Sequence, residues 1–108
     1  MAAYKVWHEF LHHVPRDFRY SLGAKIDRSL IETTEFLFVA SYLGKEQKLP
    51  YLRKANARLD IAKFFLQILW DVKALDTKKY ILLSEKLGET GKMLGGWIRG
   101  IESKPPAR

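Results

Sequence analysis

Apolar residues recur with the three- and four-residue spacing of an α-helix along nearly the whole chain, and no segment shows the alternation typical of a strand. The pattern predicts four helices, over residues 3–13, 17–43, 50–74 and from Asp76 or Thr77 to about residue 103. Pro15 ends the first helix because proline cannot continue helical geometry and restricts the residue before it. Gly44 is expected to end the second helix, and Pro50 to begin the third.

Each long helix contains one apolar stripe that is expected to face a common core. The stripes are Ile26, Leu30, Thr33, Leu37 and Ala40, then Leu52, Ala55, Leu59, Ala62, Leu66 and Leu69, and last Tyr80, Leu83, Leu87, Thr90, Leu94, Trp97 and Ile101. Short connections make neighbouring helices antiparallel. The sequence therefore predicts an all-α, up-down four-helix bundle with one short N-terminal and three long helices. It is one domain over residues 1–103, followed by a flexible tail over residues 104–108.

A second apolar stripe follows another face of the third helix, at Ile61, Phe65, Ile68, Val72 and Leu75. It either completes the core of a single chain or covers another subunit, because a large exposed apolar face usually marks an interface. One heptad earlier, the same face carries Lys54 and Arg58, as expected of a charged rim around an apolar interface. We therefore expect Ile61, Phe65, Ile68 and Val72 to form an oligomer interface.

The formal charge of +7 favours polyanionic partners, although a net charge of this size also serves solubility. On the fourth helix, basic residues occupy adjoining heptad positions and are interrupted by Glu85. These residues are Lys78, Lys79, Lys86, Lys92 and Arg99. They form either an ordinary solvated edge or, together with Lys54 and Arg58, a phosphate-binding surface.

Glycines crowd the end of the fourth helix, at Gly91, Gly95 and Gly96 beside Trp97. Each costs about 1 kcal/mol relative to alanine in a helix interior. Because they flank the predicted core stripe, we expect close packing of a neighbouring helix or subunit there. A phosphate-binding loop is less consistent with this position, since no strand precedes it.

Catalytic chemistry finds little support in the residues. His8 and His12 match the H-E-x-x-H zinc motif, but no third ligand is evident, and a five-residue match has a high false-positive risk. No cysteine is present. We therefore expect no enzymatic activity, no metal and no cofactor. The chain has no apolar run of membrane-spanning length, and we expect a cytoplasmic protein without a membrane partner.

Two segments together carry a family resemblance: residues 15–23 (PRDFRYSLG) and residues 91–98 (GKMLGGWI). They resemble the Avd family, the accessory variability determinants of diversity-generating retroelements. The resemblance covers about residues 15–101 and implies a barrel-shaped homopentamer of four-helix bundles without catalytic activity. It also implies binding to a reverse transcriptase and to template RNA or cDNA during mutagenic retrohoming. The matching motif positions are Arg16, Arg19, Gly91, Gly95, Gly96 and Trp97.

The Avd family is related to four-helix bundle proteins encoded in intervening sequences of 23S rRNA genes. A structural or interaction module of that kind, with unknown activity, is therefore the alternative function. Whether Arg16 and Arg19 bind nucleic acid or support the bundle is open at this point, as are the subunit number and the surface that contacts a polymerase.

Overall fold

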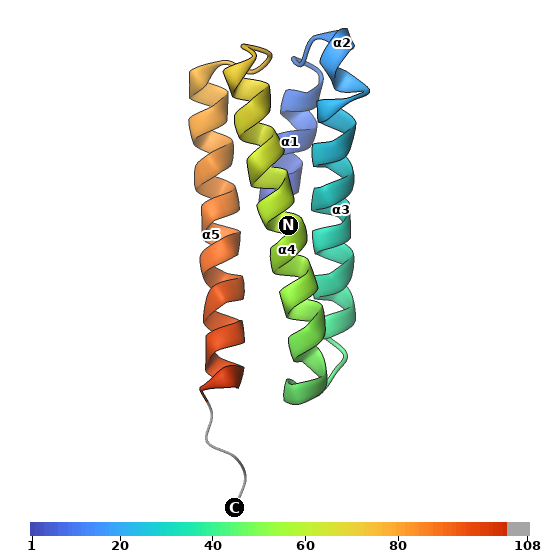
Figure 1. Ribbon diagram of the computed structural model, residues 1–108, viewed down its shortest axis with the longest axis vertical. Helices are drawn as coiled ribbons and strands as arrows, with labels where there is room; N and C mark the ends of the chain where they lie inside the picture. The colour runs from blue at the N-terminus through green and yellow to red at the C-terminus, as the bar shows by residue number, and fades with distance from the viewer. Residues whose placement is uncertain (104–108) are drawn as a thin grey trace, which may run out of the picture.

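The computed structural model describes residues 1–103 as a helical bundle (Figure 1). Its elements are α1 (Ala2–Leu11), α2 (Arg16–Arg19), α3 (Leu22–Ala40), α4 (Lys45–Asp71) and α5 (Thr77–Glu102). The single turn α2 connects α1 to α3, and the other four helices run alternately up and down. The predicted all-α four-helix bundle with a short N-terminal helix is therefore confirmed. The predicted tail, residues 104–108, lies outside the described residues.

The expected helix over residues 17–43 is wrong in two respects. The chain breaks between α2 and α3, and α3 ends at Ala40, so Gly44 precedes α4 and does not end α3. The break lies at Ser21, whose backbone (φ −115°, ψ −92°) leaves the helical region, and its hydroxyl donates to the carbonyl of Asp17 at 3.2 Å. The break packs the chain tightly against Gly23. A Cβ at Gly23 would lie 3.2 Å from both the Phe18 carbonyl oxygen and Leu11 Cδ1.

Helix α4 begins at Lys45, five residues before the predicted start at Pro50. Gly44 precedes the first turn, and its carbonyl accepts the Lys48 N–H at 2.8 Å. Pro50 therefore lies in the second turn on an exposed side, where its ring replaces the donor of one backbone hydrogen bond. The segment expected to be a loop is helical, and it places Lys45 and Lys48 on an ordered scaffold.

The core follows the predicted stripes closely. All six predicted positions of α4 are buried, together with Ile26, Leu30, Thr33 and Ala40 from α3 and Leu83, Leu87 and Leu94 from α5. Leu37, Tyr80, Thr90 and Ile101 are half-buried. Trp97 is the exception: its side chain is 49% exposed, so its predicted place in the core of the chain is wrong.

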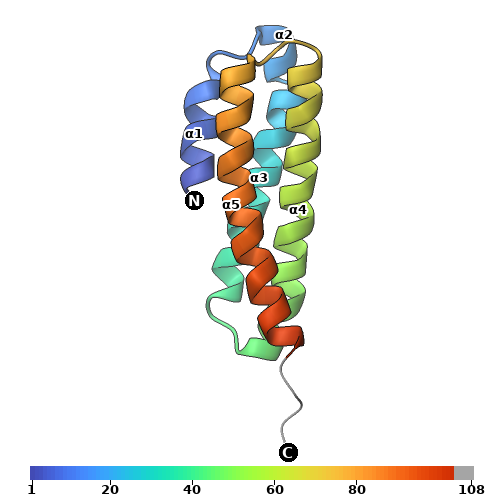
Figure 2. The same cartoon turned by 90° about the vertical axis from the view of Figure 1, so that its left-hand side faces the viewer.

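Helix α1 covers only part of the bundle. It has 10 residues and spans about 15 Å, whereas α4 has 27 residues and spans about 40 Å. The N-terminus consequently lies near mid-height beside α3 and α5 (Figure 2). We call residues 37–54 and 92–102, which lie beyond α1, the open end, and the remainder of the helices the closed end.

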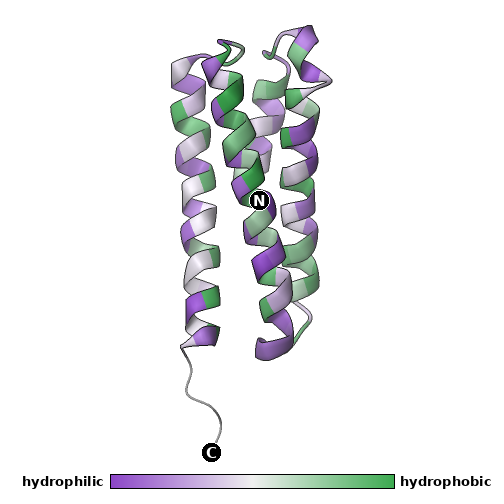
Figure 3. Ribbon diagram, in the orientation of Figure 1, coloured by the Kyte–Doolittle hydropathy of each residue, from purple (hydrophilic) through white to green (hydrophobic). Residues whose placement is uncertain are grey.

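The two ends also differ in polarity along α4. Figure 3 shows hydrophilic residues where α4 begins and more hydrophobic residues toward its other end. Within residues 1–103, no helix combines the length and the apolar character that a membrane span requires.

Candidate nucleic-acid interface

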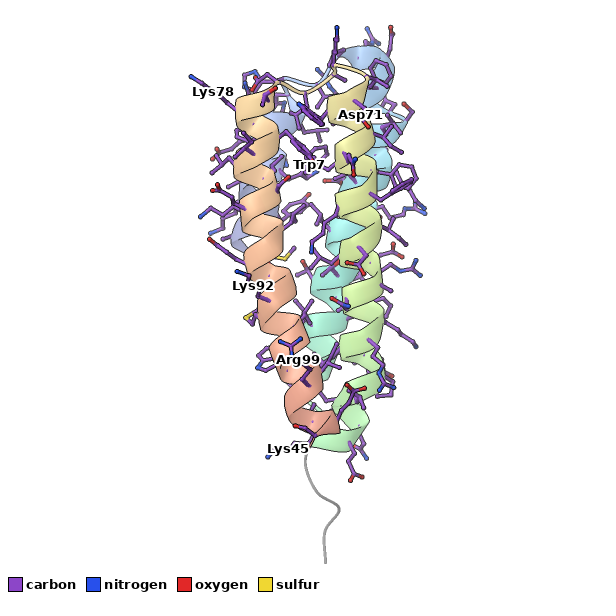
Figure 4. All side chains as sticks on the ribbon, turned by 60° about the vertical axis from the view of Figure 1, so that its left-hand side comes forward. Trp7, Lys45, Asp71, Lys78, Lys92 and Arg99 are labelled. Carbon is purple, nitrogen blue, oxygen red and sulfur yellow. The ribbon has the colours of Figure 1, made fainter. Side chains whose placement is uncertain are left out.

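Three exposed cations lie along one side of α5. Lys78, Lys92 and Arg99 share a heptad register, in which Glu85 occupies the remaining position. Consecutive register positions are about 10.5 Å apart along the axis. Figure 4 shows these cations spaced along α5, with Lys45 near its lower end. Among the described residues none of the three cations forms an ion pair, so they are available to phosphates along this side.

Lys79, in contrast, is engaged within the chain. Its ammonium lies 2.7 Å from Asp76 Oδ2 and 5.8 Å from the centroid of the Phe10 ring. Asp76 is the N-cap of α5, as predicted, and accepts the Lys79 backbone N–H at 2.9 Å. These hydrogen bonds to Lys79 lower the pKa of Asp76 below its ordinary value. Lys79 therefore supports the start of α5, whereas Lys86 is half-buried on the same helix without an ion pair to any described residue.

The two arginines of the N-terminal motif have different environments. Arg16 is exposed. The Nη2 atom of Arg19 donates to the carbonyl of Val14 at 3.1 Å and to that of His12 at 3.3 Å. Arg19 Nε is buried. The guanidinium thus holds the connection between α1 and α2, which supports a structural role for Arg19, and its binding of phosphate stays a prediction.

Lys54 and Arg58 lie on the side of α4 that faces α3. Lys54 Nζ is 5.2 Å from the Tyr51 ring centroid and 5.8 Å from that of Phe36. Arg58 Nε is 3.9 Å from Glu32 Oε1. Phosphate binding here would compete with an existing carboxylate, so this face is a weaker candidate than the line on α5.

The second apolar stripe of α4 is only partly covered. Ile61, Phe65 and Ile68 are half-buried, and Phe65 packs against the core. Val72 is exposed, as is the neighbouring Phe64. The stripe is therefore compatible in part with both expected roles. It completes the core of the chain at Phe65, and it leaves apolar surface that another subunit could cover. The oligomer interface stays a prediction.

The glycines of α5 do not share one role. A Cβ at Gly91 would lie 2.8 Å from Lys63 Nζ, the end of a flexible side chain, and 3.6 Å from Leu59 Cδ2, so Gly91 faces α4 in ordinary van der Waals contact. A Cβ at Gly95 would meet only the guanidinium of Arg99 from its own helix, at 3.0 Å, and one at Gly96 would meet no atom within 4 Å. Close packing of another helix of the same chain is therefore wrong for Gly95 and Gly96. Packing against another subunit stays a prediction for them and for Trp97.

A family model described as bAvd-like matches residues 1–101. The chain belongs to the bAvd-like family. This match confirms the resemblance carried by residues 15–23 and 91–98 and extends it to α1. No curated protein and no solved structure matches the chain.

Sequence reasoning missed Asp27, which attaches α1 to the bundle of this bAvd-like chain. Asp27 Oδ1 accepts the Tyr4 hydroxyl at 2.9 Å and the Trp7 indole N–H at 3.1 Å. Burial, followed by the hydrogen bond to Asp27 and its negative charge, raises the pKa of Tyr4. Tyr4 and Trp7 are spaced to share a helix face, but only the fold brings Asp27 to them.

A pocket at the open end was also missed. It has a volume of about 340 Å³ and is lined by Lys45, Lys48, Gly96, Trp97, Gly100 and Ile101. The two lysines are three residues apart, which places them on one face of a helix. A loop at residues 44–48, as expected from the sequence, gives no reason to group them. Recognising that α4 begins at Lys45 would have placed both lysines beside the end of α5.

The H-E-x-x-H motif is not assembled into a larger cluster. The His8 and His12 rings meet edge to face with centroids 5.7 Å apart, and both side chains are exposed. In residues 1–103, no three metal-ligating side chains come together.

Proposed function

We propose that this chain is an oligomeric, non-enzymatic accessory protein of a diversity-generating retroelement, which binds the reverse transcriptase and template RNA or cDNA to support mutagenic retrohoming. Membership of the bAvd-like family indicates an accessory, non-catalytic protein of this retroelement type. The observation that carries the proposal is the family match over residues 1–101. It favours this function over that of an rRNA intervening-sequence protein, with which the fold alone is equally compatible.

The charge distribution supports the nucleic-acid part of the proposal. Lys78, Lys92 and Arg99 present their charges outward along more than two heptads of α5. A line of unpaired cations can track a phosphate backbone without reading bases. This side is therefore the first surface to test.

The test is RNA binding measured over a range of salt concentrations. Each phosphate contact contributes a slope of about −0.7 to log K against log salt for a single strand. Changing Lys92 and Arg99 together to Gln should reduce the magnitude of the slope by about 1.4. The matched control changes Lys25 and Arg28 together to Gln, which removes the same charge at exposed positions of α3 far along the chain from α5. Absence of salt-dependent binding by the natural chain would refute the nucleic-acid part.

The reverse transcriptase and the assembly are tested separately. Co-purification with the reverse transcriptase encoded beside the gene should succeed, and a neighbouring template and variable repeat pair should be present. Light scattering should give a mass several times that of the chain, with five subunits expected from the family resemblance. Val72→Glu should lower that mass while leaving the helix content unchanged, since Val72 is exposed at the predicted interface. A monomer at micromolar concentration would contradict the assembly.

A further inference from the structure

The pocket at the open end combines a concave shape, an exposed aromatic ring and two cations. It is concave, with a volume of about 340 Å³, at the small end of the range of about 300–1,000 Å³ for ligand pockets. Trp97 lines it with a half-exposed indole. Lys45 and Lys48 line it from the first turn of α4, and neither forms an ion pair within residues 1–103.

The composition of the open end favours an anionic occupant. Among residues 37–54 and 92–102, the basic residues are Lys45, Lys48, Arg53, Lys54, Lys92 and Arg99, against the acidic residues Glu46 and Glu102. Arg53 and Glu102 pair with each other across α4 and α5, so the excess positive charge belongs largely to the others. An apolar helix laid over the pocket would have to desolvate two ammonium groups without providing partners, which is costly.

The bare surface of α5 allows a flat ligand to approach the pocket. A Cβ at Gly96 or Gly100 would meet no atom of residues 1–103 within 4 Å, so packing among these residues does not account for either glycine. Both line the pocket beside Trp97. A ring stacked on the indole would therefore lie beside the backbone of α5 at these two glycines, with no side chain in its way.

We propose that this pocket binds an unpaired nucleotide of a single-stranded nucleic acid, whose base stacks on Trp97 and whose phosphates contact Lys45 and Lys48. Stacking on aromatic side chains combined with nearby cations is the usual means of binding single strands without sequence preference. The inference rests on the proposed nucleic-acid binding and specifies an unpaired strand and one contact site. It is distinct from the cation line on α5, which requires only a phosphate backbone.

The first experiment measures binding of fluorescent 12-nucleotide oligouridine and oligodeoxythymidine by anisotropy, with a 12-base-pair duplex as comparison. Trp97→Ala should weaken binding of the single strands by about 5- to 150-fold, the range for loss of one stacked base. Trp97→Phe should retain most of the affinity. Tyr20→Ala, at an exposed aromatic residue outside the pocket, should leave it unchanged. Either strand supports the proposal, and the tighter of the two identifies the preferred sugar.

The lysines and glycines provide independent variants. Changing Lys45 and Lys48 to Gln should reduce the magnitude of the salt slope by about 1.4. Gly96→Ala and Gly88→Ala form a matched pair on α5, because neither new Cβ meets any atom within 4 Å and only Gly96 lines this pocket. Both should raise Tm by about 4–8 °C. Only Gly96→Ala should weaken binding, which separates loss of the site from loss of the fold.

The outcomes separate this inference from the proposed function. If the natural chain binds single strands with a salt-dependent affinity and Trp97→Ala binds equally well, the pocket proposal is overturned and the general function stands. If the natural chain binds no nucleic acid, the function itself fails. If Trp97→Ala or Gly96→Ala instead lowers the assembled mass measured by light scattering, the occupant is another copy of the chain and the nucleotide proposal is wrong.

Discussion

Trp7 and Trp97 lie toward opposite ends of the bundle, and they differ in almost every respect. Trp7, in the closed end, is 0% exposed and donates its indole N–H to Asp27. Trp97, in the open end, is 49% exposed and has no hydrogen-bond partner among the described residues. The difference follows from the length of α1, which brings Trp7 into the bundle and ends before it reaches the level of Trp97. Trp7 completes the core at the closed end, whereas Trp97 at the open end is available to a partner.

The largest expected effect distinguishes these two tryptophans by stability. Trp7→Ala should lower the free energy of unfolding by about 3–5 kcal/mol, because it removes a large buried side chain and leaves a cavity. Trp97→Ala should cost less than about 1 kcal/mol, as for a typical surface position. Urea denaturation followed by circular dichroism measures both, and Trp7→Phe provides a milder variant if Trp7→Ala does not fold. Equal losses at the two positions would contradict the contrast between the two ends.

A smaller effect is expected at the attachment of α1. Asp27→Ala should lower the free energy of unfolding by about 1–3 kcal/mol, because the Tyr4 hydroxyl and the Trp7 indole would lose their acceptor. Asp27→Asn retains a carbonyl oxygen in the same place and should cost less. Hydrogen exchange should show that the loss of protection is greatest in α1. Uniform loss over all helices would indicate that Asp27 supports the whole bundle rather than this helix.

The stability that the contact between Tyr4 and Asp27 contributes should depend on pH in the alkaline range. The pKa of Tyr4 is raised above the ordinary 10.0. The stability from its neutral form is therefore fully present below pH 10, and it is lost as the pH rises through the raised pKa. The expected sign is a decrease in stability on the alkaline side, since the phenolate would face the Asp27 carboxylate. Tyr4→Phe should remove this component of the pH dependence, and an unchanged alkaline profile in that variant would exclude Tyr4 as its source.

The smallest expected effect concerns the cation line on α5. Glu85→Gln removes the one acidic residue from the register of Lys78, Lys92 and Arg99. Exposed charges interact by about 0.2–1 kcal/mol, so RNA affinity should rise by no more than about fivefold. Glu9→Gln, at an exposed position of α1, is the control for net charge. Equal gains in both variants would show that overall charge, rather than this side of α5, determines binding.

The sequence predicted the core of the bundle because helical periodicity directly determines which residues share a face. Every predicted position of α4 from Leu52 to Leu69 is buried. The failures lie where tertiary structure overrides local signals. Pro50 is tolerated in a second turn, and the backbone at Ser21 leaves helical geometry where the apolar pattern would continue the helix. Trp97 is exposed beyond the end of the short helix α1, and the apolar stripe of the fourth helix contains no information on the length of another helix.

The candidate site was predictable only in part. The heptad register placed Lys78, Lys92 and Arg99 together, since they belong to one helix. The roles of the remaining residues depend on partners elsewhere in the chain. These are Glu32 beside Arg58, the Phe36 ring beside Lys54, and the carbonyls of His12 and Val14 beside Arg19. The pocket at Trp97 joins the start of α4 to the end of α5. Its recognition required the antiparallel pairing of these two helices.

The central claim is that Trp97 contacts an unpaired base, and fluorine NMR of protein labelled with 5-fluorotryptophan tests it most directly. The chain has three tryptophans, so three signals are expected, and Trp97→Phe identifies the one of interest. On addition of oligouridine, the Trp97 signal should shift in a saturable, salt-sensitive manner while the Trp7 signal stays in place. A Trp97 signal that ignores saturating RNA and responds only to protein concentration would contradict the account.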